Sequence, residues 1–280
     1  MTTDLREIIS STRAYNFHSH TQFCDGRATM AEMASAAVAA GLRHYGFTPH
    51  SPVPVESGCN MKFDRVDEYI AEFRRLKELM APEISLYLSM EIDFLDTWGA
   101  FHPYFDTLPL DYRLSSVHFI PSLVSPDTEV DVDGRPARFI ARMAEHFDGD
   151  IRYVVDRFYE RTLLMIEKGG FDIIGHFDKI RANAMAYSPG IDREPWYRRH
   201  VEDVIEALRE TDVIVEVNTK ALLPNLDASP ADIAAHKPHL FPEPDIVRRL
   251  AQAGVPLAVN SDAHFPERVT AGRAEAFKLI

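Results

Sequence analysis

The chain has 280 residues, 46% of them hydrophobic, and a formal net charge of −13 at pH 7. That charge repels polyanions and disfavours a nucleic-acid partner, and no apolar run is long enough for a transmembrane helix, so no membrane partner is expected. Two cysteines, Cys24 and Cys59, make no disulfide framework, and the first residues lack the features of a signal peptide. A cytoplasmic location fits these observations.

The first extended stretch carries a pair of histidines. Tyr15 and Phe17 favour a strand, and Gly26 marks the turn after it. Side chains on a strand repeat every second residue, so His18 and His20 are expected to point to one face. Two imidazoles at the mouth of a loop can bind one metal ion. A satisfied pair of core histidines would give the same pattern, and this stretch alone does not separate the two interpretations.

Strand and helix signals then alternate along the chain. Apolar spacing and capping residues predict helices over 29–40, 64–80 (with Asp64 as N-cap), 152–168, 196–209, 244–253 and from about Glu267 to the end. Besides the first stretch, strands are predicted over 44–48, 85–90, 113–119, 171–176, 212–218 and 256–260. This alternation predicts an α/β fold with a parallel sheet or barrel, formed by one domain over residues 1–280.

Residues 121–150 are the least regular part of the sequence. We interpret them as an insertion or lid that contains a short helix over 136–147. The acidic residues before that helix are Asp127, Glu129, Asp131 and Asp133. Their spacing lacks the later glutamate of an EF-hand loop, so they are interpreted as a solvated surface and not as a calcium site.

Metal-type side chains stand at the C-terminal end of nearly every predicted strand. The set is His18, His20, Asp25, His50, Glu91, His118, His176, Asp262 and His264. In a β/α barrel such ends meet on one face, where active sites lie. Each residue alone could be a turn residue or a polar strand end, but together, when buried, these groups would repel or stay unpaired without a cation. They exceed what one zinc ion needs, so two or three metals are predicted.

The other histidines fall in helices, loops or strand starts. We interpret them as surface or structural residues: His44, His102, His146, His200, His236 and His239. A lone histidine needs no function.

Short motifs around these positions resemble the polymerase and histidinol phosphatase (PHP) family, in the same order along the chain. They are His18-Ser19-His20, Pro49-His50-Ser51-Pro52, the lone Glu91, Ser116-Val117-His118, Gly175-His176-Phe177-Asp178 and Ser261-Asp262-Ala263-His264. Longer pieces around them, among them the stretch that ends in Cys24-Asp25-Gly26, resemble the histidinol-phosphate phosphatase branch. The resemblance implies a distorted seven-stranded (β/α)7 barrel, a small-molecule phosphate ester as substrate, and hydrolysis of L-histidinol phosphate in histidine biosynthesis.

The same resemblance implies an assignment of metal ligands. His18, His20, Glu91 and Asp262 would hold one metal; Glu91 would bridge to a second, completed by His118 and His176; and Asp25, His50 and His264 would hold a third. All these donors are nitrogen or oxygen, which suits zinc, manganese or iron. Cys24 is left out, because in an extended chain it would point to the opposite face from Asp25.

The phosphate contacts depart from the usual pattern of the family. Phosphate recognition favours Arg or Lys. We predict Arg181 as the first contact and Lys220 as the second, although Leu223 stands where the family often has an arginine. Arg193 or Arg273 could compensate.

Either Asp262 or His264 is the candidate proton donor to the leaving oxygen. Two alternatives stay open. One is a PHP-type or amidohydrolase-like metallohydrolase that acts on another phosphoester or on an amide. The other is a non-catalytic metal-binding module, which would be expected to lack ligands, whereas none is missing here.

Overall fold

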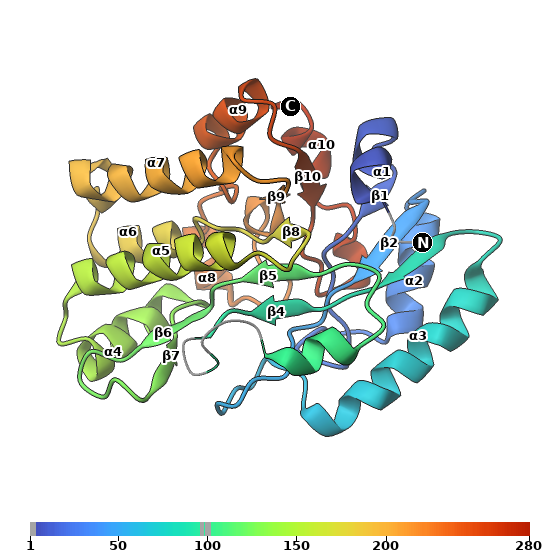
Figure 1. The fold of residues 1–280 in the computed structure, drawn as a ribbon, viewed down its shortest axis with the longest axis horizontal. Helices are drawn as coiled ribbons and strands as arrows, with labels where there is room; N and C mark the ends of the chain where they lie inside the picture. Colours follow the sequence, from blue (N-terminus) through green and yellow to red (C-terminus); the bar gives the residue numbers. More distant parts are fainter. Residues whose placement is uncertain (1–3, 96–97, 99–101) are drawn as a thin grey trace.

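The computed structural model describes residues 4–95, 98 and 102–280, and its parallel strands form two sheets (Figure 1). The first sheet has the order β1-β2-β3, with strands Tyr15–Asn16, His44–Phe47 and Ser85–Leu88. The second has the order β10-β9-β8-β5-β4, with strands Leu257–Asn260, Ile214–Asn218, Ile173–Ile174, Leu114–Ser116 and Glu91–Asp93. The predicted α/β class with parallel strands is confirmed. The described strands form no single closed sheet, so the seven-stranded barrel is not established by them.

The chain passes from the first sheet to the second between β3 and β4. The predicted strand over 85–90 therefore breaks, and Glu91 begins a new strand instead of following the end of an old one. The break has a physical reason in the pairing of the two residues between the strands. Ser89 N donates to Phe47 O of the first sheet at 3.0 Å, whereas Met90 O accepts from Leu114 N of the second sheet at 3.2 Å.

Two isolated parallel bridges connect the two sheets. One pairs Ser19, after β1, with Ala263, after β10; the other pairs His50, after β2, with Glu91. The first bridge joins the carboxyl ends of β1 and β10, and the second joins the carboxyl end of β2 to the start of β4. Histidines and carboxylates from distant parts of the sequence therefore meet on one side of the sheets.

Helices cover the sheets, and two buried clusters form the core. The helices are α1 (Leu5–Ser11), α2 (Met30–Ala39), α3 (Val66–Met80), α4 (Pro136–His146), α5 (Ile151–Lys168), α6 (Ile180–Tyr187), α7 (Pro195–Arg209), α8 (Pro230–Ala235), α9 (Pro244–Gln252) and α10 (Arg273–Ala276). One cluster packs the first sheet against α2 and α3, and the other packs the second sheet against α5, α7 and α9. Figure 1 shows α2 and α3 at the opposite end of the molecule from α5 and α7. None of the helices in the described residues combines the length and the apolar character needed to cross a bilayer.

Two local predictions differ from the structure. Asp64 is not an N-cap, because it lies inside a 3-10 turn over Phe63–Arg65 and α3 begins at Val66. The long final helix is replaced by a 3-10 turn over Pro266–Arg268 and by the short α10; Gly272, with φ of +70°, interrupts any continuous helix. Helices α1, α6 and α8 were not predicted.

Residues 1–3, at the start for which no signal peptide is predicted, lie outside the described residues.

The segment 121–150 forms ordinary secondary structure. Strands β6 (Phe119–Pro121) and β7 (Glu129–Asp131) make an antiparallel pair, and α4 follows where a short helix is predicted.

The acidic residues of this segment correct the interpretation as a solvated surface. Glu129 forms a buried pair with Arg161 of α5, at 2.8 Å, and only Asp127 is fully exposed. Asp131 pairs with Arg142 at 3.1 Å, and Asp133 pairs with Lys179 at 2.6 Å. Basic residues of α4, of α5 and just before α6 form ion pairs with the acidic ones. The spacing of the acidic residues alone could not predict these pairs.

Candidate metal centre

All nine predicted metal-type residues come together in the structure. Their ligand atoms fall into overlapping groups, within each of which the atoms lie within 4.8 Å of one another. The groups are His20, Asp25, His50 and His264; His18, His20 and Asp262; Glu91, His118 and His176; and His50, Asp93 and His118. The last group contains Asp93, which is not among the predicted residues.

Glu91 lies between two sets of histidines. Its Oε2 is 3.3 Å from His18 Nε2 and 3.0 Å from His50 Nδ1. Its Oε1 is 2.9 Å from His176 Nε2 and 3.3 Å from His118 Nε2. The carboxylate is 1% exposed, so neither oxygen is satisfied by solvent. A carboxylate that presents one oxygen to each set of imidazoles has the geometry needed to bridge two cations.

Two of these histidines are oriented by buried carboxylates. His18 Nδ1 lies 2.7 Å from Glu216 Oε1, and His118 Nδ1 lies 2.7 Å from Asp93 Oδ1. When Nδ1 donates to a carboxylate, the lone pair of Nε2 is left free to bind a cation. The nine metal-type residues, called the cluster below, are therefore backed by two carboxylates, which fix the tautomers of His18 and His118.

Sequence reasoning missed both carboxylates. Glu216 stands in the middle of the apolar run that forms β9, and Asp93 is the second residue after Glu91. A charged residue inside a strand predicted to be buried is a signal that could have identified Glu216, because such a charge needs a buried partner.

Several buried ligand atoms lack hydrogen bonds in the described structure. They are Nε2 of His118, Nε2 of His176 and Oδ1 of Asp25. Burial raises the pKa of Glu91, but the facing imidazoles of His18 and His118 outweigh that effect and hold its pKa well below the usual range. An ionised buried carboxylate among unsatisfied imidazole nitrogens needs a cation. The residues present thus fit divalent metal ions.

The loop after His20 turns back over the cluster. Asp25 Oδ1 is 3.3 Å from His264 Nε2 and 3.7 Å from His20 Nδ1. Gly26 is required for this approach, because a Cβ there would lie 2.3 Å from the backbone N of Thr21. Cys24 also faces the cluster, with Sγ 3.4 Å from His20 Nδ1. The expectation that it points away was wrong, since the loop forms a turn and is not extended.

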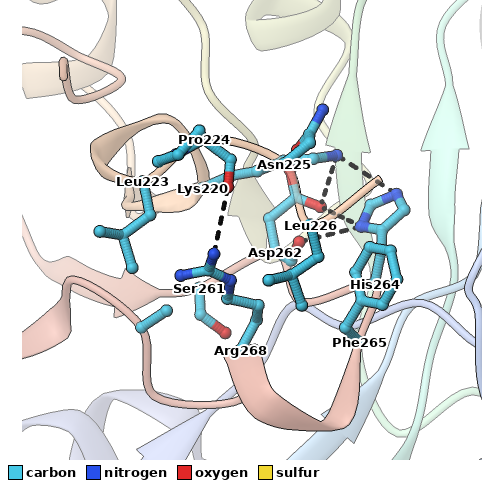
Figure 2. A pocket seen from close by; sticks show the side chains of 11 residues that line it. Lys220, Leu223, Pro224, Asn225, Leu226, Ser261, Asp262, His264, Phe265 and Arg268 are labelled. Atoms are coloured by element: carbon cyan, nitrogen blue, oxygen red, sulfur yellow. Dashed lines mark hydrogen bonds and ion pairs between the residues drawn. The ribbon is translucent and has the colours of Figure 1, made fainter. Parts of the chain in front are cut away.

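Asp262 occupies a conformation that only a few residue types adopt readily. Its φ is +49°, in the left-handed region, and its Oδ1 lies 3.1 Å from His20 Nε2. Lys220 Nζ donates to the same oxygen at 3.3 Å and lies 3.2 Å from His264 Nε2 (Figure 2). Lys220 is thus the predicted phosphate contact that the structure brings to the cluster.

A cavity opens beside these residues (Figure 2). Its polar wall contains Lys220, Asp262 and His264, and its apolar side includes Leu223 and Phe265. Leu223, which stands where the family often has an arginine, therefore lines the space next to the cluster and contributes no charge to it.

The other predicted phosphate contacts have different partners. Arg181 Nη2 pairs with Asp192 at 2.7 Å and with Glu243 at 2.9 Å, and within the described residues it has no ion pair with the cluster. Arg273 is 4% exposed and donates to the backbone O of Val259 and of Arg13. Arg193 is exposed in a 3-10 turn over Ile191–Arg193.

Three histidines outside the cluster have local partners. His44 Nδ1 lies 2.8 Å from Tyr87 Oη, and His200 Nε2 lies 2.7 Å from Asp156 Oδ1. His102 accepts from Tyr104 N at the start of a 3-10 turn. These contacts agree with structural roles.

Comparisons with known proteins agree with this arrangement. The family model described as the PHP domain matches residues 16–220. A protein of Deinococcus radiodurans named probable histidinol-phosphatase is 28% identical over 269 residues, which cover 94% of this chain and 91% of the relative.

Two solved structures share the fold. The HisK protein of Listeria monocytogenes superposes with a TM-score of 0.75 at 16% identity, over 93% of this chain and 99% of that one. Histidinol phosphate phosphatase HisK of Lactococcus lactis, crystallised with zinc, L-histidinol and phosphate, superposes with a TM-score of 0.65 at 17% identity, over 95% and 92%.

Proposed function

The chain belongs to the PHP domain family, and on that premise we propose that it is a metal-dependent phosphomonoester hydrolase that converts L-histidinol phosphate to L-histidinol and phosphate in histidine biosynthesis. The observation that carries the chemistry is the position of Glu91, with one oxygen toward His18 and His50 and the other toward His118 and His176. The substrate is supported by the relative named probable histidinol-phosphatase, which aligns with this chain over 94% of its length.

We propose two or three divalent ions, drawn from zinc, manganese and iron, because every donor is nitrogen or oxygen. The first site would use His18, His20, Glu91 and Asp262; the second would use Glu91, His118 and His176; the third would use Asp25, His50 and His264. The groups of ligand atoms within 4.8 Å of one another support the second site as a whole, the first without Glu91, and the third with His20 added to it. His20 Nε2 and Nδ1 face Asp262 and Asp25 respectively, at 3.1 and 3.7 Å.

Paired metal ions supply Lewis acidity and lower the pKa of a water molecule that they bind. The protein supplies orientation and proton transfer. Lys220 would donate to a phosphoryl oxygen from the side of Asp262. Asp262 or His264 would deliver the proton to the leaving alkoxide; His264, at 12% side-chain exposure against 2% for Asp262, is the more accessible donor. Arg181 stays a prediction, since it would have to leave Asp192 and Glu243 to reach phosphate.

We propose further that the two sheets are one distorted barrel of seven strands in a single domain over residues 1–280, with residues 121–150 as its insertion. Counting β3 and β4 as one interrupted strand gives seven parallel strands, and the bridges Ser19–Ala263 and His50–Glu91 support this description. The cytoplasmic location stays a prediction.

The test is phosphate release from L-histidinol phosphate, beside p-nitrophenyl phosphate and several sugar phosphates, after reconstitution with Mn, Zn or Fe. We expect a strong preference for L-histidinol phosphate. His18→Ala and Glu91→Ala should remove the activity, because each deletes a ligand of the cluster. His146→Ala, which removes a partly exposed imidazole of α4, should retain it.

The outcomes separate the alternatives. Metal-dependent turnover of other phosphate esters without this preference would keep the chemistry and reject the substrate. An absence of phosphatase activity in fully metal-loaded protein would reject the phosphatase and leave an amide or another ester as the substrate of the cluster.

A further inference from the structure

A second lysine stands at the cluster, and no sequence argument pointed to it. Lys179 Nζ lies 2.6 Å from Asp133 Oδ2, with the two side chains 13% and 29% exposed. Lys179 precedes α6, and Asp133 follows β7 in the segment 121–150. The pair therefore joins that segment to the body of the protein.

The backbone places this pair beside the Glu91 group. Val132 N donates to His118 O at 2.8 Å, so Asp133 follows a residue that is hydrogen-bonded to His118. Lys179 N donates to His176 O at 2.9 Å, which sets Lys179 on the turn directly after His176. The ion pair thus joins the turn after His176 to a segment that is hydrogen-bonded to the backbone of His118.

The turn that carries Asp133 is held in place from α6. Asn183 Nδ2 donates to Val132 O at 3.0 Å and to Gly134 O at 3.3 Å, and Asn183 is 4% exposed. The residues on both sides of Asp133 are therefore fixed. Because the turn is fixed, the 2.6 Å contact with Asp133 Oδ2 determines where the ammonium of Lys179 lies.

The charges of the cluster act on this ammonium. The carboxylate of Asp133 pairs with the ammonium of Lys179 at 2.6 Å, and the carboxylates of Asp262 and Glu91 are near enough to attract it as well. Lys179 is therefore a cation near the carboxylates of the proposed first and second metal sites.

Other cations near the cavity have partners of their own: Arg268, which lines it, donates to the backbone O of Pro224 at 3.1 Å. Arg181 is held by two carboxylates, and Leu223 replaces the arginine that the family often has. Lys220 approaches the cluster from the side of Asp262 and His264. Lys179 starts from the turn after His176, and the carboxylates of Asp262 and Glu91 act on its ammonium.

We propose that Lys179 is a phosphate-binding residue of this site and that Asp133 is the positioning residue that holds its ammonium toward the cluster. An ammonium has three N–H donors; Asp133 occupies one, and others remain for a phosphoryl oxygen. The inference rests on the proposed function for the identity of the anion, a phosphomonoester. It adds a phosphate contact beyond Lys220 and Arg181.

The experiment measures binding of inorganic phosphate to metal-loaded protein by calorimetry, with the metal content of each variant determined beforehand. Lys179→Met should weaken phosphate binding by about 10- to 100-fold, the range for a charge-assisted hydrogen bond. Lys179→Arg, which keeps the charge, should lose less. Lys278→Met, a matched change at an exposed lysine, should bind phosphate like the wild type. In turnover assays, KM should rise more than kcat falls in Lys179→Met.

The role of Asp133 is tested by combining variants. Asp133→Asn alone should weaken phosphate binding, whereas Asp133→Asn in the Lys179→Met background should not weaken it further, because the group that it positions is gone. Additive weakening would overturn the positioning role.

Other outcomes would overturn the role of Lys179. These are wild-type phosphate affinity in fully metal-loaded Lys179→Met, loss of metal from that variant, or no phosphate binding by the loaded wild-type protein. If only the proposed function is wrong, the two measurements differ: phosphate binding still depends on Lys179, but no phosphomonoester is hydrolysed.

Discussion

His18 Nδ1 lies 2.7 Å from Glu216 Oε1, and both side chains are completely buried. Glu216 also accepts the backbone N–H of His176 through its other oxygen, at 3.0 Å. One carboxylate therefore orients His18 and supports the strand end that carries His176. The site depends on this residue although it does not face the centre itself.

We expect Glu216→Gln to weaken metal binding by about 10- to 100-fold while the fold is retained. Glutamine keeps one oxygen acceptor, but its amide NH2 cannot accept from a second donor. Competition with a metal indicator measures the affinity. Glu206→Gln, on the exposed face of α7, is the control. Equal affinities in the two variants would contradict the orienting role of Glu216.

Asp93→Asn should reduce the number of metal ions bound per chain by one. Asp93 Oδ1 holds His118 Nδ1 at 2.7 Å, and Oδ2 accepts from Asn60 at 2.8 Å, so the amide nitrogen of an asparagine would face one of these donors. The sites formed by His18 and its neighbours should stay filled. Elemental analysis gives the stoichiometry, with exposed Asp64→Asn as the comparison. Full occupancy in Asp93→Asn would refute the assignment.

Removal of the metals should lower thermal stability as well as activity. Glu91 and Asp262 are buried, and their charges are best compensated by cations. Metal at about 100 times its Kd should stabilise the folded state by about 2.7 kcal/mol relative to chelated protein. Differential scanning calorimetry in a metal titration measures this, with potassium chloride at equal ionic strength as the control. A melting temperature that is independent of divalent metal would count against a buried metal centre.

Gly175→Ala should destabilise the fold by about 1–3 kcal/mol, the usual cost of overpacking. A Cβ there would lie 2.3 Å from Ser116 Oγ and 2.9 Å from Leu114 Cδ2. Ser116 Oγ donates to Glu91 Oε1 at 2.7 Å, so the clash also disturbs the cluster. Urea unfolding measures the change. Gly58→Ala, where a Cβ has no neighbour within 4 Å, should be close to neutral.

Glu129→Gln should cost about 3–5 kcal/mol of unfolding free energy, because it removes the charge of a buried carboxylate that contacts both Nη atoms of Arg161. The side chains of this pair are 3% and 4% exposed. Glu72→Gln, which breaks the largely exposed pair with Arg75, should cost about 0–1 kcal/mol. Denaturant unfolding measures the loss of unfolding free energy in both variants. Equal losses would show that the contact of Glu129 with α5 does not stabilise the position of residues 121–150.

The parallel α/β class was predictable because it follows from local patterns. Helix α2 begins after Thr29, whose capping box with Glu32 is visible in the sequence, and buried strands such as β9 read as apolar runs. The break between β3 and β4 was not predictable from residues 85–93. Ser89 and Met90 are divided between the two sheets by Phe47 and Leu114, which lie far away in the sequence.

The sequence by itself predicted which histidines and carboxylates at the strand ends come together, apart from Asp93. Histidines and carboxylates stand at successive strand ends, and parallel strands connected by helices bring such ends together, so order along the chain predicts proximity. Only the tertiary structure decided what surrounds them. Side chains from different elements make these contacts: Glu216 with His18, Asp133 with Lys179, and Arg181 with two carboxylates. Such contacts depend on how those elements pack, and no local pattern encodes that packing.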